Sequence, residues 1–248
     1  MTENITVNVL LCDTFPGRLP DDIPSYVSMH QRLVHRVNPY VQFRVFMAME
    51  GQLPSSLNQD EIYLIPGCIN SAYDPLPWIP KLEQWICRAI EKGVFLVGVC
   101  FGHQIIAQAL GGKVAHYAGG WGTGIRQSEV LDTDLRQFFP DGNMHLLYNH
   151  HDQVVEAPEE SITLATSGFC RYEALRYSDH VFTFQGHPEY TPSYMRFYFD
   201  HLAAEQDAAV VERGRQSLIQ MQPQGDAVAR FVLHAFTQYR FSNSRRGN

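Results

Sequence analysis

The chain has 248 residues, of which 45% are hydrophobic and 18% charged, the balance of a globular protein with a sizeable core. Its formal net charge of −7 disfavours nucleic acid and anionic membranes as partners, and no apolar run is long enough to span a bilayer. The first residues lack the basic segment of a secretory signal, and the five cysteines are odd in number. We therefore expect a cytoplasmic protein with reduced thiols.

Over the first 110 residues, apolar runs of strand length alternate with helical spacing. The pattern predicts strands at 5–11, 41–49, 61–65 and 94–99, and helices at 24–37, 77–92 and 101–110. Strands that alternate with helices favour a mostly parallel sheet with helices on both faces.

After Gly111-Gly112 the predicted strands are shorter and lie closer together. We expect them at 113–116, 123–131, 144–148, 153–156, 162–166, 172–177 and 181–185, a pattern typical of antiparallel pairing. A helix is predicted from 192 to about 213 and a last helix from 225 to about 239. We expect both to pack on the sheet, so that residues 1–248 form a single domain with a C-terminal helical extension at about 192–241.

Cys100 stands between Gly98 and Gly102, where a predicted strand turns into a predicted helix. This arrangement is typical of a nucleophile elbow, here with sulfur in place of the usual serine oxygen. Such a turn strains the backbone of its central residue, and the flanking glycines leave room for neighbouring backbone to approach. The N-terminus of the following helix favours negative charge near the sulfur.

His187 and Glu189 follow the last predicted strand, with Pro188 between them. Residues two apart in an extended segment project to the same side. Glu189 can then accept a hydrogen bond from one imidazole nitrogen while the other nitrogen faces a nucleophile. Because Cys100 and His187 are far apart in the chain, only the fold can join them.

These motifs resemble the class I glutamine amidotransferases. The elbow at 98–104, Gln-Gly-His-Pro-Glu at 185–189 and Pro66-Gly67 after the third predicted strand occur in that family's order. Asn-His-His-Asp-Gln-Val at 149–154 is similar to a segment of the GMP synthetase glutaminase, as is Gly-Trp-x-x-Gly at 120–124. The resemblance implies a flavodoxin-like, doubly wound α/β fold with a mostly parallel central sheet, helices on both faces and a smaller antiparallel sheet.

The resemblance also implies a mechanism in which Cys100 attacks the γ-amide of glutamine and forms a γ-glutamyl thioester. His187 would accept the thiol proton and later protonate the departing ammonia, while Glu189 orients the imidazole. The backbone amides of Gly67 and Phe101 would form the oxyanion hole. Water would then release glutamate.

Three further residues, Gln104, His150 and Asp152, resemble family positions that bind the substrate. The simpler alternatives are an amide on a helix surface for Gln104 and a polar turn for the other two. His103 is expected to pack behind the elbow. No spacing of ligands indicates a metal, and we expect neither a metal nor a cofactor.

The chain departs from the family pattern at Cys68 and His151, where glycine is frequent. Cys68 opens the question of whether the loop at Gly67 is preformed or is set by a partner protein.

Three functions remain open from the sequence. The main interpretation is a glutaminase or amidotransferase that delivers ammonia to a separate synthase, favoured because residues 70–79 resemble stand-alone proteins similar to GMP synthetase. The alternative is a γ-glutamyl peptidase or hydrolase, which cleaves γ-glutamyl amides such as glutathione conjugates. A non-catalytic binding module on the same fold is the third, and the intact set of Cys100, His187 and Glu189 argues against it.

Overall fold

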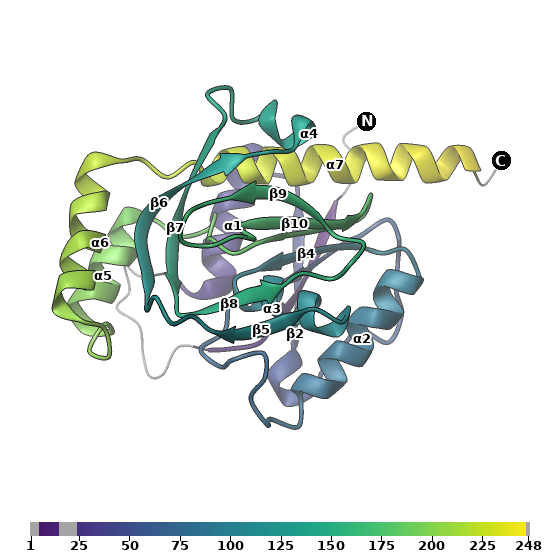
Figure 1. The fold of residues 1–248 in the computed structure, drawn as a ribbon. Helices are drawn as coiled ribbons and strands as arrows, with labels where there is room; N and C mark the ends of the chain where they lie inside the picture. Colours follow the sequence, from purple (N-terminus) through teal and green to yellow (C-terminus); the bar gives the residue numbers. More distant parts are fainter. Residues whose placement is uncertain (1–4, 15–23, 247–248) are drawn as a thin grey trace.

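The computed structural model describes residues 5–14 and 24–246, which form an α/β structure in layers (Figure 1). Its strands are β1 (Thr6–Leu11), β2 (Gln42–Met47), β3 (Ile62–Ile65), β4 (Phe95–Val99), β5 (Lys113–His116), β6 (Gly122–Val130), β7 (Asn143–His150), β8 (Asp152–Glu156), β9 (Ile162–Thr166), β10 (Ala174–Ser178) and β11 (Val181–Phe184). Its helices are α1 (Tyr26–Val37), α2 (Ile79–Glu91), α3 (Phe101–Ala109), α4 (Thr133–Arg136), α5 (Pro192–His201), α6 (Ala208–Gln220) and α7 (Gly225–Arg246), with a 3₁₀ turn η1 (Ala48–Glu50).

Nine strands form one mixed sheet in the order β2-β1-β3-β4-β11-β10-β9-β6-β7. The first five of these are parallel to one another. The other four continue the sheet with antiparallel pairing. Strands β5 and β8 pair separately as a small antiparallel sheet. The predicted α/β fold with a parallel core and a smaller antiparallel sheet is confirmed.

Helices cover both faces of the parallel strands because successive side chains of a strand point to opposite faces. On one face, Val97 and Phe182 belong to the same apolar cluster as Phe231 and Phe236 of α7, and α1 packs against this cluster. On the other face, Leu96 and residues of α2 and α3 form a second cluster. Helices α5 and α6 lie at the β6–β7 end of the molecule, as Figure 1 shows.

The helix predicted from 192 to about 213 is wrong, because the chain leaves the helix after α5 and starts α6 after a connection of six residues. Asp207 caps the new helix by accepting a hydrogen bond from the Ala209 amide at 2.8 Å. Before it, the Gln206 side chain donates to Asn149 on β7 at 2.7 Å, a contact that draws this connection toward the sheet. The last helix is longer than predicted and continues to Arg246, and the short helix α4 was not predicted.

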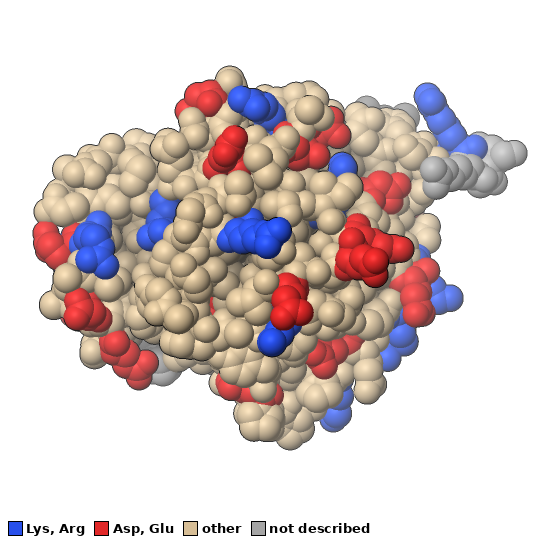
Figure 2. All heavy atoms as spheres, in the orientation of Figure 1, with Lys and Arg blue, Asp and Glu red and all other residues tan. Residues whose placement is uncertain are grey.

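Acidic and basic side chains are interspersed on the face drawn in Figure 2, without a broad patch of one sign. Within the described ranges, none of the helices combines the length and the apolar character that crossing a membrane requires.

The elbow depends on backbone packing that excludes side chains at two glycines. A Cβ atom on Gly102 would lie 1.9 Å from the carbonyl oxygen of Ile65 at the end of β3. A Cβ atom on Gly98 would lie 2.5 Å from the carbonyl oxygen of Gly102 itself. The start of α3 therefore lies against the ends of β3 and β4 with no room for a methyl group.

Replacing Gly102 with alanine should lower the free energy of unfolding by about 3 kcal/mol, since the new methyl group forces the helix away from β3. The loss should appear even though alanine favours a helix by about 1 kcal/mol over glycine. Gly168→Ala is the matched control, because a Cβ atom there meets nothing within 4 Å. Urea unfolding of both variants tests the prediction, and equal stabilities would contradict it.

Candidate active site

Cys100 lies between the end of β4 and the first residue of α3, at the predicted elbow. Its backbone has φ 53° and ψ −104°, and it is the only non-glycine residue of the described ranges with positive φ. Its amide donates to the carbonyl oxygen of Phe184 at 2.8 Å, which joins the elbow to the end of β11. A side chain held in so sparsely populated a conformation marks a candidate functional position.

The fold brings Cys100 and His187 together through the pairing of β4 with β11. Val99 and Phe184 are register partners in this parallel pair, so both motifs leave the sheet at the same edge. The His187 amide donates to the carbonyl oxygen of Leu147 on β7 at 2.7 Å, and its ring stacks on Tyr190 with centroids 3.8 Å apart. The imidazole therefore has a defined orientation before any substrate binds.

Glu189 binds the imidazole of His187 as the sequence predicts. The distance from Nδ1 of His187 to Oε1 of Glu189 is 2.7 Å, and both side chains are buried. Nδ1 donates to the carboxylate, so Nε2 is the ring nitrogen left for the nucleophile. The geometry matches the expected order of nucleophile, base and orienting carboxylate, while the catalytic role of each residue stays a prediction.

The charges of this buried group favour an ionised pair. Burial lowers the pKa of His187, but the Glu189 carboxylate and the neighbouring Cys100 side chain outweigh that effect and raise it. Burial raises the pKa of Glu189, but the nearby histidines His30 and His187 lower it by more, so its pKa is below the usual value. Glu189 thus carries negative charge at neutral pH and favours the imidazolium form of His187.

His30 of α1 is a member of this group that the sequence analysis missed. Its Nε2 lies 3.6 Å from Oε1 of Glu189, and burial lowers its pKa. The available signal was its position with Met29 and Leu33 on the buried side of a predicted helix. Helical spacing shows that such a histidine is buried, but not which partner it meets.

Gly67 and Phe101, the predicted oxyanion donors, both lie beside the Cys100–His187 pair. A Cβ atom on Gly67 would lie 2.8 Å from Cε1 of His187, so glycine is needed for the loop to pass the ring. The Gly102 amide donates to the carbonyl oxygen of Pro66 at 3.2 Å and holds this loop against α3. Phe101 begins α3, where the first amides have no partner within the helix.

The predicted substrate-binding residues Gln104, His150 and Asp152 all line the same cavity, but they also bond to one another. Gln104 Nε2 donates to the backbone oxygen of Asp152 at 2.9 Å and to Oε1 of Gln185 at 3.1 Å. His150 Nδ1 also lies 2.9 Å from that backbone oxygen, and burial lowers its pKa to about 3. These contacts fasten the elbow helix to the β7–β8 turn.

The Asp152 carboxylate accepts hydrogen bonds from Ser71, from Tyr73 at 2.9 Å and from His151 Nδ1 at 2.8 Å. Burial raises its pKa, but the hydrogen bonds from His151 and Ser71 outweigh this and lower the pKa to about 2. Asp152 thereby joins the loop after β3 to the start of β8.

Cys68 and His103, the other two residues discussed from the sequence motifs, hydrogen-bond within the protein. Cys68 donates from its sulfur to the backbone oxygen of Cys12 at 3.1 Å, and burial raises its pKa to about 12, so it remains a thiol. His103 lies behind the elbow as expected, with Nδ1 2.8 Å from Oγ1 of Thr183, and burial lowers its pKa to about 3.

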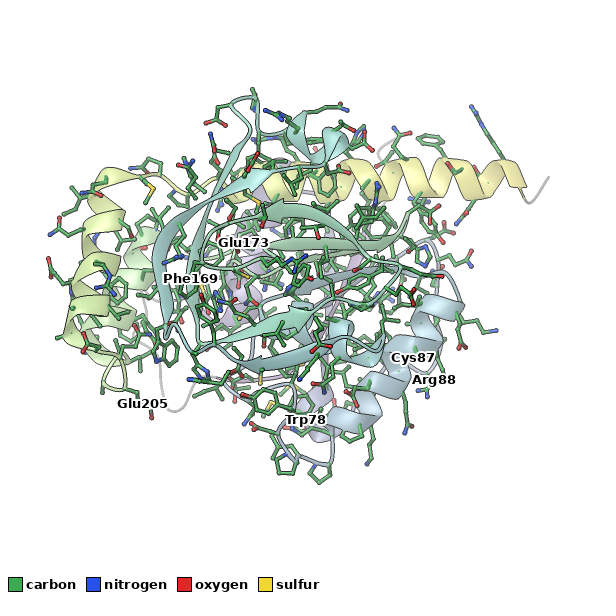
Figure 3. All side chains as sticks on the ribbon, viewed as in Figure 1. Trp78, Cys87, Arg88, Phe169, Glu173 and Glu205 are labelled. Atoms are coloured by element: carbon green, nitrogen blue, oxygen red, sulfur yellow. The ribbon has the colours of Figure 1, made fainter. Side chains whose placement is uncertain are left out.

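The cavity beside Cys100 has a volume of about 370 Å³. Besides the predicted catalytic motifs, its lining includes Trp121 before β6 and Tyr198, Leu202 and Glu205 at the end of α5 and in the connection to α6. Figure 3 shows Glu205 at this connection. Sequence patterns did not indicate this wall, because they predict one continuous helix there.

Comparisons with known proteins identify the family of this chain. Residues 23–203 match the family glutamine amidotransferase class-I. Gamma-glutamyl peptidase 3 of Arabidopsis thaliana is 33% identical over 158 residues, 60% of this chain and 63% of that protein, so the match spans less than two thirds of its length. A glutamine-hydrolyzing GMP synthase subunit from Methanothermobacter thermautotrophicus is 39% identical over 163 residues, 63% of this chain and 81% of that protein.

A solved structure of a glutamine amido transferase from Methylobacillus flagellatus has the same fold, with a TM-score of 0.70 at 19% identity and 94% of each chain covered. At that identity the likeness concerns the fold alone. The family match, in contrast, spans well over half of the chain and includes both the elbow and the His-Pro-Glu element. The chain belongs to the class I glutamine amidotransferase family.

Proposed function

We propose that this protein is a γ-glutamyl hydrolase that cleaves γ-glutamyl amides through a thioester on Cys100. This was the alternative in the sequence analysis, where a glutaminase was the main interpretation. Similarity to a gamma-glutamyl peptidase supports the hydrolase. The leaving group would be an amine larger than ammonia, from a γ-glutamyl peptide or a glutathione conjugate.

In the proposed reaction, Cys100 sulfur attacks the γ-carbonyl carbon after its proton passes to Nε2 of His187. Glu189 holds the imidazolium by its Nδ1–H hydrogen bond, and the amides of Gly67 and Phe101 stabilise the oxyanion. The C–N bond breaks as His187 returns the proton to the amine. Water, deprotonated by His187, then attacks the thioester and releases glutamate.

The observation that carries the proposal is the extent of the cavity. A volume of about 370 Å³ falls in the range of sites for whole small molecules. Besides the residues around Cys100, its lining includes Trp121, Tyr198 and Leu202, which offer apolar and aromatic surface to a leaving group, and the acidic Glu205. Ammonia has no apolar surface that could pack against these residues, whereas the amine of a peptide or conjugate does.

A glutaminase that delivers ammonia to a synthase partner is the second candidate. The specific observation in its favour is the 39% identity to the GMP synthase protein of Methanothermobacter. Both candidates share the nucleophile and the thioester, so they differ only in which amine leaves.

The donor preference separates the two candidates. We expect kcat/KM for a γ-glutamyl dipeptide or glutathione conjugate to exceed that for glutamine by about 10- to 100-fold, the contribution of about 1–3 kcal/mol from a well-filled apolar pocket. Amine or ammonia release is measured for each donor on the full chain. A preference for glutamine would favour the glutaminase instead.

Cys100→Ala should abolish turnover of every donor while the fold is retained, because the thioester cannot form. Cys87→Ala is the matched control, since this thiol lies on α2 away from the cavity (Figure 3). Intact-protein mass spectrometry of the wild type with donor should detect a γ-glutamyl adduct, and peptide mapping should place it on Cys100. Turnover by the alanine variant would refute the mechanism whatever the donor.

Glu189→Gln should shift the alkaline limb of the kcat/KM profile to lower pH. The carboxylate raises the pKa of His187, so its removal lets the imidazolium lose its proton at a lower pH. We also expect kcat to fall by roughly 10²- to 10⁴-fold, because glutamine no longer favours the correct tautomer. Glu156→Gln, at an exposed carboxylate of β8, is the control. An unshifted limb would show that Glu189 does not tune His187.

A further inference from the structure

Three metal-binding atoms converge on the outer side of the β7–β8 turn. Nδ1 of His116, at the end of β5, lies 3.0 Å from Nδ1 of His151. Nδ1 of His151 lies 2.8 Å from Oδ1 of Asp152, and His116 Nδ1 lies 3.6 Å from the same oxygen. No other group of three or more such side chains is as close in the described ranges. The main and small sheets meet here.

These separations fit a single tetrahedral ion. Zinc bonds of about 2.1 Å to nitrogen and oxygen separate neighbouring ligand atoms by about 3.4 Å, and the three observed distances lie on either side of that value. A point about 2.1 Å from all three atoms therefore exists just outside their plane. Two imidazoles and one carboxylate leave a fourth position for water or a ligand.

Hydrogen bonding alone accounts poorly for the cluster. A neutral imidazole nitrogen is either a donor or an acceptor, so His151 Nδ1 cannot donate to Asp152 and also accept from His116. If His151 Nδ1 carries the proton and donates it to Asp152, His116 Nδ1 has no proton of its own to share and can only accept the same one. One cation that accepts a lone pair from each of the three atoms satisfies all of them.

The carboxylate is also held in place, as ligands of metals usually are. Tyr73 and Ser71 donate to Asp152, and its side chain is only 7% exposed. Trp121 packs edge-on against the His151 ring, with centroids 4.6 Å apart. His116 is 62% exposed on its side chain, so an ion can enter from solvent.

We propose that His116, His151 and Asp152 bind a divalent transition-metal ion, with Zn²⁺ the best match to two imidazoles and one carboxylate. The site differs from the catalytic group, but His151 and Asp152 also line the cavity. An ion here would join β5 to the β7–β8 turn at the cavity rim. The proposal stands independently of the donor that Cys100 attacks. Sequence spacing gave no sign of it, because β5 and β8 meet only in the fold.

The test is calorimetric titration of the full chain, without a polyhistidine tag, with Zn²⁺. Cys100→Ala serves as the background, because the thiol of Cys100 with His187 is itself a pair that Zn²⁺ can bind. We expect one ion per chain. His116→Ala removes a ligand and should weaken Zn²⁺ binding by at least about 100-fold, because losing even a residue that only hydrogen-bonds to a ligand weakens metal binding by up to that factor. His116 is exposed, so its loss should leave the fold intact. His145→Ala, a histidine of β7 that bonds to Gln127, is the control.

Titration with Co²⁺ identifies the ligand atoms. Nitrogen and oxygen ligands give visible bands without the intense near-ultraviolet charge transfer that a thiolate produces. Visible bands that disappear in His116→Ala but persist in His145→Ala support the site. Absence of saturable binding, unchanged affinity in His116→Ala, or a thiolate band in the Cys100→Ala background would each overturn it.

Discussion

The start of α3 lies against the ends of β3 and β4 so closely that a methyl group at Gly98 or Gly102 would meet backbone atoms. This contact requires the chain to turn from strand to helix at one residue, and Cys100 takes the positive φ that the turn needs. The same close approach holds the Pro66–Gly67 loop through the Gly102 amide. Cys100, the predicted nucleophile, and both predicted oxyanion donors are therefore placed by a single backbone packing arrangement.

The buried charges of the site have to be paired, because an isolated charge in the interior costs several kcal/mol. Glu189 meets this requirement with His187 at 2.7 Å and His30 at 3.6 Å. Burial lowers the pKa of His30, so His187 is the histidine that carries the paired positive charge. The low pKa of His30 and the raised pKa of His187 then leave the proton on the imidazole that faces Cys100. A buried ion pair contributes little net stability, so stability alone gives little reason for this arrangement.

Much of the fold was predictable because the signals are local. Apolar runs of strand length predict the first four strands. The elbow and the His-Pro-Glu element each occupy a few consecutive residues. The parallel pairing of β4 with β11 brings Cys100 and His187 together. This pairing was not predicted, because the strand at 181–185 was expected among the antiparallel strands. His30, the convergence of His116 with His151 and the bonds among Gln104, His150 and Asp152 were not predictable, because each depends on segments that meet only in the tertiary structure.

The wrongly predicted helix bears on substrate choice. Apolar residues continue at helical spacing from α5 toward α6, so the local pattern does not show the break before Asp207. At the break, Gln206 bonds to Asn149 and Asp207 caps α6, and the connection places Leu202 and Glu205 on the cavity. Glutaminases and γ-glutamyl hydrolases share the elbow and the histidine, so those motifs cannot distinguish their leaving groups. Under the proposed function, the leaving group would be distinguished by walls such as this connection, where local sequence patterns are least informative.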